Sequence, residues 1–98
     1  MIVESLIADR EVLYFMKQDG CPACEAGATE LSKFMSKHPA VTVLSIDVDG
    51  PYPGRLGVKR IPGTPFYLFR RGNEGVTKIG VLKVAELERW LKSLRATI

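Results

Sequence analysis

Two cysteines, Cys21 and Cys24, stand three residues apart at the point where a short apolar run gives way to a helical pattern, and the chain has no others. A disulfide can close between cysteines at this spacing without refolding of the chain, so the pair predicts thiol-disulfide chemistry. The junction also restricts the fold. A buried strand that leads directly into a helix is the first half of a β-α-β unit, which pairs its two strands in parallel.

The hydrophobic pattern around the cysteines predicts these elements. Residues 11–17 form a nearly continuous apolar and aromatic run, too short for an ordinary helix and typical of a buried strand. From Pro22 the apolar residues recur at helical spacing, and this pattern ends near His38. Residues 41–48 are rich in β-branched side chains, so we expect a second strand, parallel to the first.

The second half of the chain is predicted to begin with a loop. Residues 49–64 are rich in proline and glycine, and we expect one helical turn near 55–58. Two apolar runs at 65–70 and 75–79 flank a turn and predict an antiparallel hairpin. An apolar stripe from 83 to 95 predicts a helix that packs on the sheet.

These elements predict an α/β fold with a mixed sheet and helices on both of its faces. The sheet has four strands, or five if a short element in residues 2–8, whose type the pattern leaves open, is a strand. With 98 residues, of which 46% are hydrophobic and 26% charged, we expect a single domain spanning residues 1–98.

Composition argues against several classes of function. The chain shows no leader pattern and no apolar run of membrane-spanning length, so we expect a cytoplasmic protein without membrane association. A net charge of +3 without basic residues interleaved with aromatics does not favour nucleic-acid binding. We further expect a monomer.

The predicted strand, loop and helix give the two cysteines different roles. Cys21 falls at the helix N-terminus, where free N–H groups and the positive end of the helix dipole stabilise a thiolate, so its pKa should lie below the value of about 8.5 of a free cysteine. Cys24 lies one turn further along. We therefore predict that Cys21 attacks a disulfide and Cys24 resolves the mixed disulfide. Pro22 suits the first helical turn, because it costs no hydrogen bond there, and it keeps the cysteines close.

Two other uses of the cysteines are weaker alternatives. Both could simply pack as small apolar side chains. A metal site is the sharper rival, but zinc usually takes four ligands, and the sequence adds only His38, far along the helix. Copper(I) held by two thiolates, or a site completed across a dimer, stays open. We expect no metal and no organic cofactor.

Residues 11–96 resemble the thioredoxin superfamily, and two motifs carry the resemblance. The first is Cys-Pro-Ala-Cys at 21–24, after a strand and at the start of a helix. The second is the segment 61–69, Ile-Pro-Gly-Thr-Pro-Phe-Tyr-Leu-Phe, similar to the family segment in which a cis-proline begins the next strand.

The resemblance implies a substrate platform beside the cysteines. It implies that the Thr64–Pro65 bond is cis, that Pro65 faces the cysteine pair, and that the backbone of Thr64 pairs with an extended substrate segment. Pro22, between the cysteines, completes the predicted substrate-binding set.

The chain combines features of two branches of this superfamily. Its hairpin turn resembles that of thioredoxins, and it lacks the Gly-Gly-x-x-Asp-like segment with which glutaredoxins bind glutathione. Cys-Pro-Ala-Cys, however, is closer to the glutaredoxin pattern Cys-Pro-Tyr-Cys. Phe15 and Val43 stand where thioredoxins have a buried aspartate and a lysine that help move the proton of the second cysteine. The proton acceptor of Cys24 is therefore open between water and the departing thiolate.

The function that the resemblance implies is reduction of protein disulfides through a Cys21–Cys24 dithiol/disulfide cycle. A thioredoxin reductase or glutathione would supply the electrons. Three alternatives stay open: a glutaredoxin-type enzyme that depends on glutathione, a noncatalytic binding module with the same fold, and a metal carrier.

Overall fold

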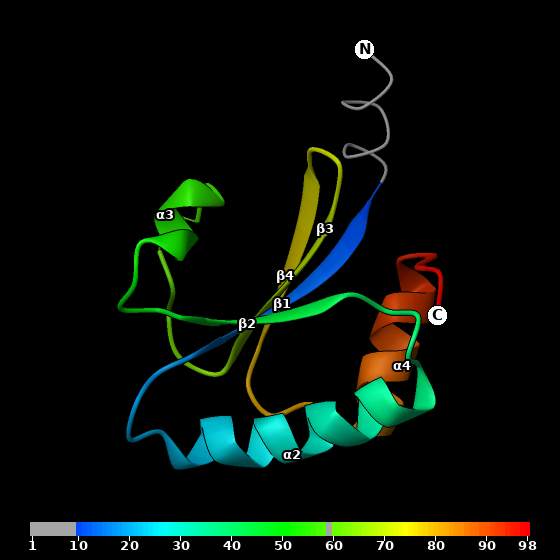
Figure 1. Cartoon of the computed structure of the whole chain (residues 1–98), viewed down its shortest axis with the longest axis horizontal. Coiled ribbons are helices and arrows are strands. Elements are labelled where there is room, and N and C mark those ends of the chain that lie inside the picture. The colour runs from blue at the N-terminus through cyan, green and yellow to red at the C-terminus, as the bar shows by residue number, and fades with distance from the viewer. Residues whose placement is uncertain (1–9, 59) are drawn as a thin grey trace.

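The computed structural model describes residues 10–58 and 60–98, so the element expected in residues 2–8 lies outside the described part of the chain. In chain order the elements are β1 (Glu11–Lys17), α2 (Pro22–Lys37), β2 (Val43–Asp47), α3 (Tyr52–Arg55), β3 (Phe66–Arg71), β4 (Glu74–Ile79) and α4 (Val84–Ser93) (Figure 1). Within these ranges no helix is long and apolar enough to cross a membrane.

The strands form a mixed sheet in the order β2-β1-β3-β4. β1 pairs with β2 in parallel, across the connection through α2, and pairs with β3 antiparallel on its other side. β3 and β4 form the predicted antiparallel hairpin. The prediction of an α/β fold with a mixed sheet is thus confirmed, with four strands among the described residues.

Alternating side chains of the central strands form a separate core on each face of the sheet. On one face, Leu13 and Phe15 of β1 pack with residues of β3, α2 and α4. On the other face, Met16 packs with apolar residues of β2, β3 and the segment 56–61. Helices therefore lie on both faces, but unequally: α2 and α4 cover the first, whereas the second is covered by the short α3 and the segment after it (Figure 1).

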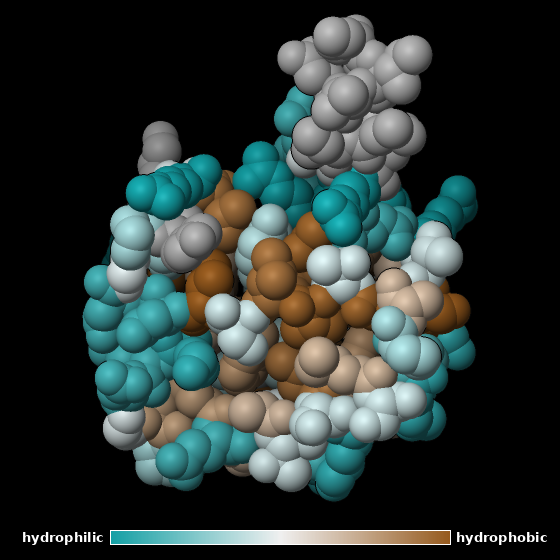
Figure 2. All heavy atoms as spheres, viewed as in Figure 1, coloured by the Kyte–Doolittle hydropathy of each residue, from teal (hydrophilic) through white to brown (hydrophobic). Residues whose placement is uncertain are grey.

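The cover of the sheet is not complete at its β2 edge. Figure 2 shows apolar side chains in the middle of the view, where β2 crosses in Figure 1, with hydrophilic side chains around them. Leu44 of β2 is 48% exposed, although it pairs in register with Tyr14, which packs against the second core.

The predicted helical turn at 55–58 is wrong by three residues, because the structure has it at Tyr52–Arg55. The prolines explain the shift. Pro53 falls in the first turn, where its missing N–H removes no helical hydrogen bond, and the carbonyl of Pro51 accepts from the N–H of Arg55. Gly57, at φ 79°, then ends the turn, since this left-handed conformation favours glycine.

The remaining differences between predicted and observed elements are small. β2 begins at Val43 instead of residue 41. The hairpin turn is tighter than the four residues predicted, because Arg71 and Glu74 still pair as strand residues and leave only Gly72 and Asn73 between them. Gly72 has φ 58°, a conformation suited to such a tight turn.

Polar contacts fix α4 against the rest of the fold. At its start, the N–H of Val84 donates a hydrogen bond of 3.2 Å to the Glu30 carboxylate on α2. At its end, the Arg71 guanidinium donates to the carbonyls of Leu94 and Arg95. Between these two ends, the carboxylate Oε2 of Glu88 lies 2.6 Å from Nε2 of His38. This hydrogen bond holds the pKa of Glu88 below its ordinary value.

Gly27 allows α2 to approach the sheet closely. It lies on the buried face of α2, together with Cys24. A Cβ at this position would lie 3.3 Å from Cγ of Pro65 and 3.4 Å from Cε1 of Phe15, so a larger side chain would push the helix away from β1 and from the start of β3.

We expect Gly27→Leu to destabilise the protein. Overpacking of a tight core site costs about 1 to 3 kcal/mol, and the better helix propensity of leucine offsets less than about 1 kcal/mol of this. Urea unfolding of the oxidised protein measures the difference. Ala28→Leu is the matched control, because Ala28 is the next residue of α2 and is exposed. Gly27→Leu unfolding at the wild-type midpoint would contradict the close contact.

Candidate active site

Cys21 caps the N-terminus of α2. Its backbone is extended, with φ −107° and ψ 100°, and its Sγ accepts a hydrogen bond of 3.1 Å from the N–H of Cys24. Gly20, at φ 71°, makes the turn from β1 possible, and Pro22 occupies the start of the helix as predicted. The sulfur of Cys21 therefore lies where the free N–H groups of the helix point.

Cys21 and Cys24 form a disulfide, with 5.2 Å between their Cα atoms. The two sides of this bond differ in their access to solvent. Cys24 is buried, with 5% of its surface exposed, whereas Cys21 is half-buried. An incoming sulfur can therefore reach Cys21 more easily than Cys24, whereas the division into an attacking and a resolving cysteine stays a prediction.

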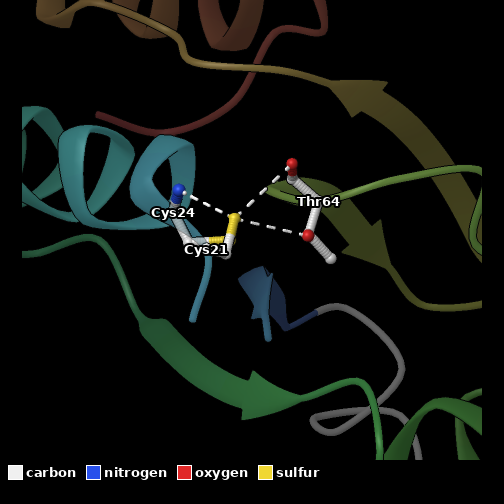
Figure 3. The surroundings of a disulfide bond; sticks show 3 residues. All are labelled: Cys21, Cys24 and Thr64. Carbon is white, nitrogen blue, oxygen red and sulfur yellow. Dashed lines mark hydrogen bonds between the residues drawn. A yellow bond between two sulfur atoms is a disulfide. The ribbon is translucent and has the colours of Figure 1, made fainter. Parts of the chain in front are cut away.

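Thr64 comes from a distant part of the chain and contacts Cys21 directly. Its hydroxyl Oγ1 donates to Cys21 Sγ at 3.5 Å, and its carbonyl oxygen lies 3.9 Å from the same sulfur (Figure 3). The hydroxyl and the N–H of Cys24 approach one sulfur from two elements, and hydrogen bonds donated to sulfur stabilise its thiolate form over the thiol.

The structure brings the other predicted site residues to the same place. The Thr64–Pro65 bond is cis, as the resemblance implied. Pro65 is buried against Gly27, three residues beyond Cys24 on α2. Pro22 is exposed at the start of α2, beside Cys21. The three other predicted residues, Pro22, Thr64 and Pro65, thus lie around the Cys21–Cys24 disulfide, although the catalytic and binding roles of all five stay predictions.

The layer beneath the cysteines is apolar. Phe15 is 1% exposed and its ring lies 5.2 Å from that of Tyr67, while Val43 packs against the same core. Burial raises the pKa of Tyr67 to about 12, so its hydroxyl, which has no hydrogen-bond partner among the described residues, stays protonated at neutral pH. Tyr67 is therefore a poor proton acceptor for Cys24, and water and the departing thiolate remain the two predicted acceptors.

The surroundings of two residues near the site, Gly27 and Arg60, could be predicted only in part from the sequence. Gly27 between two alanines predicts a close approach of backbones; the approach exists, but it is to the ring of Pro65 and to Phe15. Arg60, which the sequence offers as a neighbour of the cysteine motif but more readily as a solvated loop residue, lines an open hollow of about 410 Å³ that Thr64 also lines. No local pattern predicts this hollow, because it depends on the path of the loop.

The described residues offer little for a metal ion. Across residues 10–58 and 60–98, no group of three or more histidine, cysteine, aspartate or glutamate side chains is arranged to hold one. Within this part of the chain, a metal at the site would have the two cysteine sulfurs as its ligands.

The chain was compared with family models, with curated proteins and with solved structures, and the solved structures identify its fold. No family model and no curated protein matches the sequence. Among solved structures, chloroplastic thioredoxin z is similar with a TM-score of 0.74 and 22% identity, over 98% of this chain and 88% of that one. The chain has the thioredoxin fold.

Two further thioredoxins agree with this assignment. Thioredoxin-2 of a malaria parasite gives a TM-score of 0.71 at 17% identity, over 85% of this chain and 82% of that one. Thioredoxin O2 of Arabidopsis thaliana, in its oxidised state, gives 0.66 at 19% identity, over 94% and 87%. The thioredoxin fold and the closely spaced cysteine pair together support thiol-disulfide oxidoreductase chemistry in general.

We expect Thr64→Val to slow the reaction of Cys21 with iodoacetamide in the reduced protein at neutral pH. The substitution keeps the shape of the side chain but removes the hydroxyl donor, and loss of one weak hydrogen bond to the thiolate corresponds to about a twofold to fourfold slower rate. Thr29→Val is the control, since the Thr29 hydroxyl donates to the carbonyl of Glu25 on the exposed side of α2. Equal rates for wild type and Thr64→Val would rule out this contribution.

Proposed function

We propose that this protein reduces disulfide bonds of other proteins through a dithiol/disulfide cycle of Cys21 and Cys24. The observation that carries the proposal is the asymmetry of the pair: a half-buried sulfur at the start of α2, a buried second sulfur, and Thr64 against the first. Such a pair can attack an external disulfide with one sulfur and release the product with the other.

The proposed cycle begins with Cys21 as a thiolate. Its sulfur attacks one sulfur of the substrate disulfide, so that a mixed disulfide forms and the second substrate sulfur leaves as a thiolate. Cys24 then loses its proton to water or to that thiolate and attacks Cys21 Sγ. The Cys21–Cys24 disulfide closes, the first substrate sulfur leaves, and two electrons have passed to the substrate.

The backbone at Thr64 supports the binding part of this proposal. In the described part of the chain, neither the N–H nor the carbonyl of Thr64 takes part in a backbone hydrogen bond. Both groups therefore remain available to an extended substrate segment, which would gain main-chain hydrogen bonds as an added strand does. With the Thr64 carbonyl 3.9 Å from Cys21 Sγ, such a segment would pass directly over the attacking sulfur.

The oxidised pair must be reduced again for turnover. A thioredoxin reductase or glutathione can supply the two electrons, and we propose a donor of one of these two kinds. The cycle needs no metal or organic cofactor, because both electrons are held by the sulfurs themselves.

Cysteine variants test the proposed order of events. We expect Cys21→Ser to abolish reduction of a disulfide-bonded test protein. Cys24→Ser should instead accumulate a mixed disulfide between Cys21 and that protein, because no second sulfur is present to resolve it. Non-reducing gels and mass spectrometry of the trapped species measure both effects.

Other outcomes would point to the alternatives. Unchanged biological function of both variants would favour a noncatalytic binding module, and turnover confined to glutathionylated substrates would favour a glutaredoxin-type enzyme.

A further inference from the structure

We infer that Arg60 is a specificity-determining residue, which binds a carboxylate of the protein substrate in the hollow beside Thr64. The inference rests on the proposed function and deepens it, because it names the substrate class: disulfides with an aspartate or glutamate close to the attacked cysteine.

The hollow and the reactive sulfur share Thr64 as a neighbour. The hollow has a volume of about 410 Å³ and lies between the ends of β1 and β2, the short α3 and the segment before Pro65. Thr64 lines it and also donates a hydrogen bond to Cys21 Sγ. Because each extended residue advances the chain by about 3.3 Å, a substrate residue one or two positions from the attacked cysteine can reach the hollow.

The charge on the described wall of the hollow is positive. Arg60 is the one charged residue among the described residues that line it, and Gln18 and Thr64 add an amide and a hydroxyl. The acidic residues adjacent in sequence to its lining, Asp19, Asp47 and Asp49, do not line it. The Asp47 carboxylate accepts a hydrogen bond from the N–H of Asp49 within its own turn. An acidic ligand therefore meets a cation here without a competing carboxylate on the wall.

Arg60 is free to bind such a ligand. In the described part of the chain it takes part in no ion pair, in contrast to Arg71, which pairs with Glu11. A guanidinium presents several N–H donors in one plane and binds a carboxylate through two parallel hydrogen bonds, so an arginine in this position is suited to this ligand.

Ile61, the residue that follows Arg60, packs against the second core and also lines the hollow. This contact places the backbone next to Arg60 at the wall of the hollow.

The shape of the hollow favours a protein substrate as the source of the carboxylate. It is an open depression whose lining includes Thr64, along whose backbone we propose that an extended segment lies. A polypeptide can occupy both places at once, with its cysteine at Cys21 and its acidic side chain at Arg60.

Selectivity toward peptide disulfides tests this inference. Matched peptides carry aspartate or the isosteric asparagine at each of the two positions before and after the attacked cysteine. For the best position we expect the wild-type kcat/KM to favour aspartate by about fivefold, the range of an accessible charge-assisted hydrogen bond. In Arg60→Glu the ratio should fall below one, and raised salt should lower the wild-type ratio.

Lys17→Glu is the matched control. Lys17 is an exposed cation at the end of β1, close to the cysteines in sequence, and it does not line the hollow. The same reversal of charge there should leave the preference for aspartate in place. If both variants lose the preference equally, the general charge of the region is responsible and the assignment to Arg60 is wrong.

The other outcomes separate this inference from the proposed function. Turnover of the asparagine peptides without any preference for aspartate would overturn the role of Arg60 and leave the reductase proposal intact. Failure to reduce any peptide would overturn both. Glutathione disulfide is assayed in parallel: an effect of Arg60→Glu on this substrate alone would assign the carboxylate to glutathione and overturn the protein substrate.

Discussion

The contact of Gly27 with Pro65 and Phe15 is the constraint on which the rest of this site depends. It joins the buried face of α2 to the central strand and to the start of β3, at a separation where a Cβ at residue 27 would lie 3.3 Å from Cγ of Pro65 and 3.4 Å from Cε1 of Phe15. Because Cys21 begins α2 and Thr64 precedes Pro65, the same contact brings the hydroxyl of Thr64 to the Cys21 sulfur. Residues far apart in the chain thus meet through a packing contact that carries no charge.

The two faces of the sheet differ in how they are covered near this site. The face under α2 and α4 is densely packed and apolar, and it holds the inner cysteine away from water. The opposite face is covered mainly by α3 and the segment after it, and there an open hollow reaches Thr64. Cys21, at the start of α2, contacts Thr64 at the rim of this hollow.

Much of the fold could be predicted from the sequence, because its signals are local. The apolar run at 11–17 gave the bounds of β1, and the helical spacing after Pro22 gave α2 to within one residue. The short turn in the loop was predicted three residues too late, since its position depends on the prolines: the carbonyls of Pro51 and Pro53 accept hydrogen bonds from the N–H groups of Arg55 and Leu56. The cis bond at Pro65 followed only from the resemblance, and the hollow at Arg60 could not be predicted, because it depends on how the loop crosses the sheet.

The reduction potential of the Cys21–Cys24 couple is the most direct test of the central claim that this pair is a reversible redox centre. The protein is equilibrated in glutathione buffers of graded ratio, and free thiols are trapped at each step. We expect a single two-electron transition between a dithiol and an intramolecular disulfide, with a potential between about −270 and −120 mV, the span of thioredoxin-like proteins. Failure to form the intramolecular disulfide at any ratio would contradict the redox function.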